Sequence, residues 1–122
     1  MSKILVIDDE QSMRDFLAIM LKKEDHEVVT AGNGIDALKA VHAEIFDLVI
    51  TDVKMPGVGG IDVLKTIKEI SPETVVIMIT AFATAETAVE AMKLGAYDYI
   101  TKPFTSTQLV NGINLLLGEV KS

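Results

Sequence analysis

Cysteine is missing from this sequence of 122 residues, so disulfide bridges and metal sites built on thiolates are excluded. Long apolar runs are missing as well. The first apolar run, Ile4 to Ile7, stops at Asp8 and is too short for a signal peptide or for a membrane span. We therefore expect a soluble, cytoplasmic protein without a membrane partner.

Basic residues are scarce relative to acidic ones. The chain has 11 lysines and arginines against 18 aspartates and glutamates, which gives a formal charge of −7. The basic residues do not form a cluster, whereas binding to the phosphates of a nucleic acid needs clustered lysine and arginine. We therefore expect no direct binding of nucleic acid.

Short apolar runs and amphipathic stretches alternate regularly along the chain. The runs predict five strands, at residues 4–7, 27–31, 48–50, 74–79 and 97–100. Apolar residues three or four apart predict five helices. The first begins near Ser12 and the second near Gly34. The other three cover residues 63–70, 84–94 and 105–117. This alternation is typical of a parallel sheet with helices on both faces. We expect a single domain over residues 1–122, with a polar tail at 119–122.

The second predicted strand is the most polar of the five, which favours an edge of the sheet. We therefore predict an α/β fold of the flavodoxin-like, doubly wound kind, with five helices and strand order 2-1-3-4-5. The apolar spacing also predicts which helix faces are buried. These faces carry Met13, Phe16, Leu17, Met20 and Leu21 in the first helix, and Ala85, Ala88, Val89 and Met92 in the fourth.

Acidic side chains follow the first and third strands at the point where each strand ends. Asp8 and Asp9 follow the first run, and Asp52 follows the third, before the break at Pro56-Gly57. The predicted order brings these strand ends together, so the three carboxylates repel one another unless a proton or a cation neutralises them. A set of oxygen ligands without histidine or cysteine favours Mg²⁺.

Two further polar residues stand at strand ends, because Thr80 ends the fourth run and Lys102 follows the fifth. Phosphoryl transfer needs a nucleophile, a cation and donors that hold the transferred group. Asp52 is the candidate nucleophile, since a carboxylate can form an aspartyl phosphate. Asp8 and Asp9 are candidate metal ligands. The Thr80 hydroxyl and the Lys102 ammonium can each contact a phosphoryl oxygen.

These residues resemble the receiver domain of two-component response regulators, and the resemblance covers essentially the whole chain. The matching segments are Asp8-Asp9, Asp52 with the following V-K-M-P-G-V-G-G, Thr80-Ala81 and Lys102-Pro103-Phe104. The resemblance implies that Asp52 is the phosphoacceptor. It also implies that Mg²⁺ is bound directly by Asp9, largely through water by Asp8, and by the backbone carbonyl of Lys54.

The segment from Thr80 to Phe104 is similar to receivers of the nitrogen-regulation type, which precede an ATPase and a DNA-binding domain. The resemblance therefore implies a sensor histidine kinase as partner and a transcriptional output domain in cis. The chain is then either a stand-alone receiver or a fragment whose linker begins at 119–122. The resemblance also implies a switch, in which Tyr99 turns inward when Thr80 moves towards the phosphoryl group.

Such a domain is a signalling module that catalyses only its own phosphorylation and dephosphorylation, and is not otherwise an enzyme. The face made of helix 84–94, strand 97–100 and helix 105–117 is the candidate surface for a homodimer or for contact with the output domain. Lys54 and Phe82 occupy positions that tune the lifetime of the phosphate in this family, and the sequence leaves the direction of their effect open.

Two other functions are compatible with parts of the sequence. The segment Gly32 to Ala37 fits the pattern G-x-G-x-x-A of nucleotide-binding domains, although the preceding strand is polar and the acids would go unexplained. A Mg²⁺-dependent hydrolase that uses Asp52 as nucleophile would need a cap and a second acid-base group. The sequence indicates neither, so we expect one slow turnover at most.

Overall fold

The fold is taken from a computed structural model that describes residues 2–81, 83–102, 109 and 111–113. Its centre is one sheet of five parallel strands in the order β2-β1-β3-β4-β5, which confirms the predicted order. The strands are β1 (Lys3–Ile7), β2 (Glu27–Ala31), β3 (Leu48–Asp52), β4 (Val75–Thr80) and β5 (Asp98–Thr101). β5 starts one residue later than predicted, after Tyr97, and continues to Thr101.

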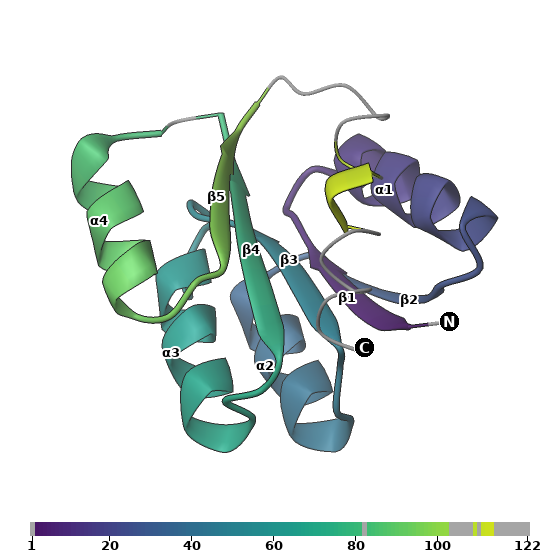
Figure 1. Cartoon of the computed structure of the whole chain (residues 1–122), viewed down its shortest axis with the longest axis horizontal. Coiled ribbons are helices and arrows are strands. Elements are labelled where there is room, and N and C mark those ends of the chain that lie inside the picture. The colour runs from purple at the N-terminus through teal and green to yellow at the C-terminus, as the bar shows by residue number, and fades with distance from the viewer. Residues whose placement is uncertain (1, 82, 103–108, 110, 114–122) are drawn as a thin grey trace.

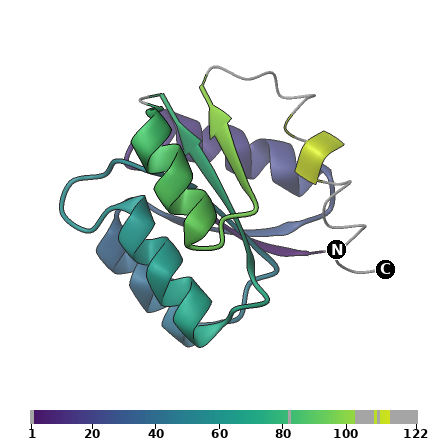
Figure 2. The same ribbon diagram turned by 60° about the vertical axis from the view of Figure 1, so that its left-hand side comes forward.

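Within the described residues, complete helices connect the strands. They are α1 (Gln11–Lys23), α2 (Gly34–Ala43), α3 (Gly60–Ile70) and α4 (Ala85–Lys93). Leu109 and residues 111–113 are also helical, and the rest of the predicted helix 105–117 lies outside the described residues. α1 covers one face of the sheet, and α2, α3 and α4 cover the other (Figures 1 and 2). No helix of the described chain is long and apolar enough to cross a membrane.

Side chains of each central strand alternate between two cores, one on each face of the sheet. In β1, Leu5 and Ile7 pack in the core on the side of α2, α3 and α4, whereas Ile4 and Val6 pack on the side of α1. The strands β1, β3 and β4 are therefore buried on both faces, as their continuous apolar runs predict. β2 is partly exposed and lies at an edge, which confirms the interpretation of its polarity.

Two of the predicted helix faces are wrong in detail. In α4 the buried residue is Ala91, whereas Val89 and Met92 are 53% and 49% exposed. Apolar and small residues occur on several sides of this helix, so their spacing did not identify the side that faces the sheet. In α1 the buried residues include Leu17 and Leu21 as predicted, but Phe16 is 43% exposed at the border of the stripe.

Candidate functional site

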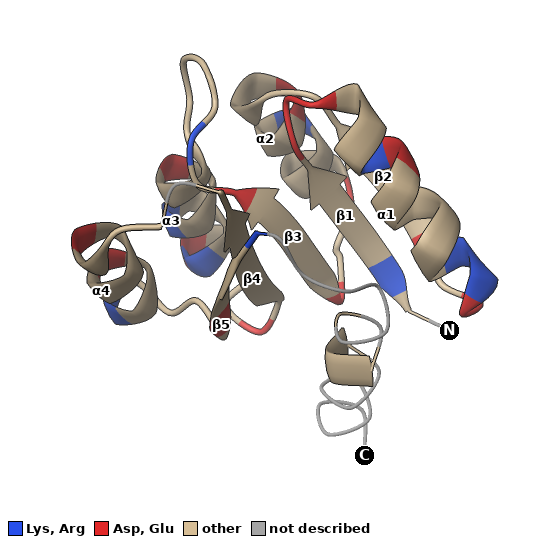
Figure 3. Ribbon diagram, turned by 90° about the horizontal axis from the view of Figure 1, so that it is seen from above, with Lys and Arg blue, Asp and Glu red and all other residues tan. Residues whose placement is uncertain are grey.

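The ends of β1 and β3 bring three carboxylates together. Asp8 directly follows β1 and Asp52 is the last residue of β3, which is the neighbouring strand. One carboxylate oxygen from each of Asp8, Asp9 and Asp52 lies within 4.8 Å of the other two. Figure 3 shows acidic residues at both strand ends, at the same edge of the sheet. The predicted convergence of the three acids is therefore confirmed.

These carboxylates differ in exposure. Asp8 is 3% exposed and Asp52 is 9% exposed, whereas Asp9 is open to solvent. Burying a carboxylate is unfavourable unless a cation or a hydrogen-bond donor compensates its charge. Asp8 and Asp52 therefore need partners within the site.

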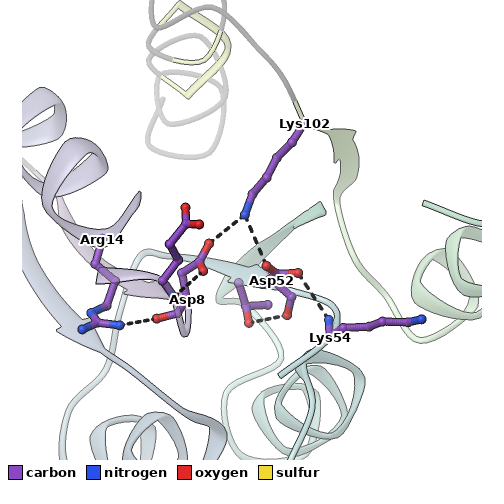
Figure 4. Close-up of polar contacts among 7 residues, drawn as sticks. Asp8, Arg14, Asp52, Lys54 and Lys102 are labelled. Carbon is purple, nitrogen blue, oxygen red and sulfur yellow. Dashed lines mark hydrogen bonds and ion pairs between the residues drawn. The ribbon is translucent and has the colours of Figure 1, made fainter. Parts of the chain in front are cut away.

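Lys102 supplies one such partner from the end of β5. Its Nζ atom lies 2.9 Å from Oδ2 of Asp8 and 3.3 Å from Oδ2 of Asp52, so it bridges the two buried acids (Figure 4). The Lys102 backbone N–H donates to the carbonyl oxygen of Thr80 at 2.8 Å, which fixes the start of this side chain next to β4. Burial by itself lowers the pKa of Lys102, but Asp8 and Asp52 outweigh that effect, so the net pKa is raised.

Asp52 remains in an environment that disfavours its ionised form. Burial raises the pKa of Asp52 above its ordinary value, and the neighbouring Asp8 carboxylate adds to the rise. The Lys102 ammonium opposes this effect, as does the Lys54 backbone N–H, which donates to Oδ1 of Asp52 at 3.3 Å. Because these partners do not cancel the rise, the site favours a further positive charge near Asp52.

The three carboxylates fit a magnesium ion by their chemistry. Mg²⁺ prefers oxygen ligands and is usually bound by one or two carboxylates together with water. The oxygens of Asp8, Asp9 and Asp52 lie within 4.8 Å of one another, so they form one group that can face a common ion. The predicted role of the Lys54 carbonyl as a further ligand stays a prediction.

The loop after β3 packs closely against the starts of α2 and α3, where glycines leave room for the backbone. A Cβ atom added at Gly60 would lie 2.0 Å from the carbonyl oxygen of Asp52, and one added at Gly34 would lie 2.2 Å from that of Val58. The Gly60 N–H donates to the carbonyl oxygen of Val53 at 2.9 Å. Only glycine allows α3 to begin this close to the end of β3.

Thr80 and Tyr99 lie on neighbouring strands near the site. Thr80 is the fully buried last residue of β4, at the same sheet edge as Asp52. Tyr99 is partly buried in β5, and its hydroxyl oxygen lies 2.7 Å from Oγ1 of Thr87 in α4. Thr80 thus lies at the strand ends, whereas Tyr99 lies two residues before the end of β5 and its phenol is linked to α4. Their roles in a switch stay predictions.

Asp8 is held by more partners than the sequence indicated. Its N–H donates to the Ala31 carbonyl oxygen at 3.2 Å, and its Oδ1 accepts from the Glu10 N–H at 3.0 Å. Nη1 of Arg14 donates to the Asp8 carbonyl oxygen at 2.6 Å. A signal for Arg14 was present in the sequence, because a cation in the first turn of a helix is unfavourable for the helix dipole.

Asn33 and Gly34 in the segment Gly32 to Ala37 have structural tasks that involve no nucleotide. The side chain of Asn33 accepts a hydrogen bond from the Asp36 N–H at 2.8 Å and caps the N-terminus of α2. Gly34 lies against Val58, where a larger residue would collide. The close contact therefore accounts for Gly34 of the pattern G-x-G-x-x-A, and the segment serves as the cap of α2.

Comparison with known sequences agrees with the geometry of the site. Residues 4–114 match the response regulator receiver domain family. The chain is 42% identical over 106 residues to the transcriptional regulatory protein ZraR of Klebsiella oxytoca, a match that covers 87% of this chain and 24% of ZraR. It is 39% identical over 101 residues to the response regulator protein PilR of Pseudomonas aeruginosa, with 83% of this chain and 23% of PilR covered.

Solved structures share the fold along nearly the whole chain. A CheY-like response regulator receiver domain protein from Methanospirillum hungatei superposes with a TM-score of 0.96 at 30% identity, covering 99% of this chain and 97% of the other. NtrX from Brucella abortus superposes with a TM-score of 0.90 at 38% identity, covering 98% of this chain and 28% of NtrX. The chain spans about a quarter of the length of the curated relatives it matches. Since the family match extends over most of the chain, we conclude that it belongs to the receiver domains of two-component response regulators.

Proposed function

We propose that Asp52 accepts a phosphoryl group from a sensor histidine kinase, or from a small acyl phosphate, while Mg²⁺ is bound by Asp8, Asp9 and Asp52. The observation that carries the proposal is the meeting of these three carboxylates with Lys102 at one edge of the sheet. Bound Mg²⁺ would supply positive charge that stabilises the oxygens of the transferred group.

The residues of the site have separate tasks in this reaction. An oxygen of Asp52 attacks the phosphorus atom and forms a new P–O bond, while the bond between phosphorus and the donor breaks and the donor leaves with its electron pair. Lys102 already lies 3.3 Å from Oδ2 of Asp52, so its ammonium is placed to neutralise a phosphoryl oxygen. The Thr80 hydroxyl donates a hydrogen bond to another phosphoryl oxygen.

The added charge of about −2 is the signal that the domain passes on. It attracts Thr80 and Lys102, and so shifts an existing equilibrium of the segments that follow β4 and β5. Tyr99 is part of this equilibrium, because its hydroxyl is hydrogen-bonded to Thr87 and any inward turn of the ring breaks that bond.

The output is proposed to be transcriptional. The relatives ZraR and PilR are a transcriptional regulatory protein and a response regulator, and this chain corresponds to about a quarter of each. We propose that residues 1–122 are the receiver domain of a cytoplasmic regulator. Residues 119–122, which lie outside the described residues, would begin the linker to ATPase and DNA-binding domains. The receiver itself acts as a signalling domain and turns over no other substrate.

Intact-mass spectrometry after incubation with acetyl phosphate and Mg²⁺ tests the proposal. We expect the wild type to gain one phosphoryl group, and we expect no gain in Asp52→Asn or without Mg²⁺. A matched control is Asp62→Asn, an exposed acid in the first turn of α3, which should be modified as the wild type is. An equal mass gain in Asp52→Asn would refute the assignment. Repeated release of phosphate from small phosphoesters would instead indicate a hydrolase.

A further inference from the structure

Arg14 makes a contact at the site that the proposed phosphoryl transfer does not use. It lies in the first turn of α1, and its Nη1 donates to the backbone carbonyl oxygen of Asp8 at 2.6 Å. Figure 4 shows the guanidinium on the backbone side of Asp8, away from Lys102, which contacts the carboxylate. Arg14 therefore holds the main chain of Asp8, whereas Lys102 holds its side chain.

The same guanidinium also lies next to Gly32, in the loop between β2 and α2. A Cβ atom added at Gly32 would lie 3.1 Å from Nη1 of Arg14 and 3.3 Å from its Cζ. The side chain thus joins three segments, namely the start of α1, the end of β1 and this loop. A planar guanidinium with several donors suits such a fixed position better than a flexible ammonium does.

The carbonyl that Arg14 contacts belongs to the peptide between Asp8 and Asp9. A peptide unit is planar, so fixing the direction of its C=O also fixes the direction in which the Cα atom of Asp9 leaves it. The Asp8 side chain has its own partners in the Glu10 N–H and Lys102. Asp9 is exposed to solvent, so its orientation depends more on the main chain that carries it.

We infer that Arg14 is a positioning residue, which orients the Asp8–Asp9 peptide so that the Asp9 carboxylate faces the metal site. The inference rests on the proposed function, because it takes Mg²⁺ as the ligand of the acidic cluster. Two effects of Arg14 on Mg²⁺ binding have opposite signs. Its positive charge repels the ion, whereas its hydrogen bond orders a ligand of the ion, and groups that orient metal ligands affect affinity by about 10-fold or more.

Direct titration of Mg²⁺ by calorimetry on the wild type and on Arg14→Met separates these effects. Methionine keeps the length of the side chain but has neither the charge nor the donors. We expect Arg14→Met to bind Mg²⁺ about 10-fold more weakly. Lys22→Met is the matched control, because it removes the same charge from the exposed last turn of α1 and should bind as tightly as the wild type or more tightly. Binding by Arg14→Met that equals or exceeds that of the wild type would overturn the inference.

Gly32→Ala is a second test that keeps every charge. The new methyl group would press on the guanidinium at about 3 Å, so we expect weaker Mg²⁺ binding, by a smaller factor than in Arg14→Met. Circular dichroism and urea unfolding in EDTA check that each variant is folded. If Arg14→Met does not fold, unchanged binding by a folded Gly32→Ala overturns the inference by itself.

The proposed function and the inference fail in different ways. A wild type that binds no Mg²⁺, or that binds it as well after Asp9→Asn, refutes the metal site itself. Mg²⁺ binding that is lost in Asp9→Asn but unaffected in Arg14→Met and Gly32→Ala refutes only the role of Arg14. In phosphorylation assays, if Arg14 is a positioning residue, Arg14→Met needs a higher Mg²⁺ concentration than the wild type for its half-maximal rate. At saturating Mg²⁺ its rate is close to that of the wild type.

Discussion

Asp52 is an ionisable side chain placed where ionisation is unfavourable. It is 9% exposed and lies beside a second buried carboxylate, Asp8, and the Lys102 ammonium compensates only part of the resulting rise in its pKa. Since the folded pKa lies above the ordinary value of 3.8, the folded protein binds more protons than the unfolded chain between these two values. Stability therefore falls as the pH rises through this window, and at neutral pH the ionised Asp52 destabilises the fold.

We predict that Asp52→Asn is more stable than the wild type at pH 7 without divalent ions. The gain should be about 1 kcal/mol, which is typical when a destabilising functional group is removed. It should shrink as the pH falls towards 3.8, where the wild-type carboxyl becomes protonated. Urea unfolding over this pH range measures the difference, with the exposed Asp15→Asn as control. A less stable Asp52→Asn at pH 7 would contradict the explanation.

The junction of β3 and α3 depends on the absence of a side chain at Gly60. Gly60→Ala should destabilise the fold by about 1–3 kcal/mol, because its Cβ would lie 2.0 Å from the carbonyl oxygen of Asp52 and the backbone must shift. Gly112→Ala is the matched control. Gly112 is helical with open space around it, so alanine should stabilise by up to about 1 kcal/mol. Urea unfolding of both variants tests the pair, and changes of equal sign would show that the close contact is not the cause.

α4 is the helix with least apolar burial among those that the structure describes fully, since Ala91 is its buried residue. Its start depends on a capping box, in which Oγ1 of Thr84 accepts from the Thr87 N–H at 3.1 Å. Oγ1 of Thr87 is in turn 2.7 Å from the Tyr99 hydroxyl oxygen. The stability of this helix end is therefore coupled to the side-chain position of Tyr99.

We predict that Thr84→Ala loosens α4 without unfolding the sheet. The loss of an N-cap hydroxyl typically costs about 1 kcal/mol, which should appear as faster hydrogen exchange of the α4 amides. Thr66→Ala in α3 is the control, because its hydroxyl donates to the carbonyl oxygen of Asp62 within the same helix and caps no helix end. If α4 amides exchange at the wild-type rate in Thr84→Ala, the capping box does not limit the stability of this helix.

The molecule as a whole presents an apolar area on the surface of α4. Val89 and Met92 are each about half exposed there, next to Ala88. The charged residues Glu86, Glu90 and Lys93 lie on the same helix beside Val89. This area lies within the face predicted for a homodimer, of which the helix 105–117 is largely outside the described residues. A dimer through this face remains a proposal.

We predict that Val89→Lys prevents dimerisation in whichever state, unmodified or phosphorylated, the wild type dimerises. A lysine in the centre of an apolar interface must be desolvated, which is unfavourable without a partner charge. Sedimentation velocity measures the association, and Ile19→Lys on the equally exposed surface of α1 serves as control. Dimerisation of Val89→Lys together with loss of the dimer in Ile19→Lys would move the interface to α1.

The order of the strands and the edge at which the acids meet could be predicted from the amino-acid sequence. Continuous apolar runs identify strands that are buried on both faces, and a polar run identifies an edge strand, so the order of the sheet followed from burial. Parallel strands all end at one edge, and Asp8, Asp52 and Thr80 therefore converge wherever that fold forms. The side on which α4 is buried could not be predicted, because its apolar residues are not confined to one face.

The residues at the strand ends could thus be predicted from the sequence, because an apolar run and the polar residue that ends it are both local features of the chain. The direct contacts of those residues could not be predicted in this way. Lys102 reaches Asp8 across 94 positions of the chain, and Arg14 reaches the Asp8 carbonyl from the next helix. Such contacts depend on how helices and strands are rotated against one another, and only the packed tertiary structure decides that.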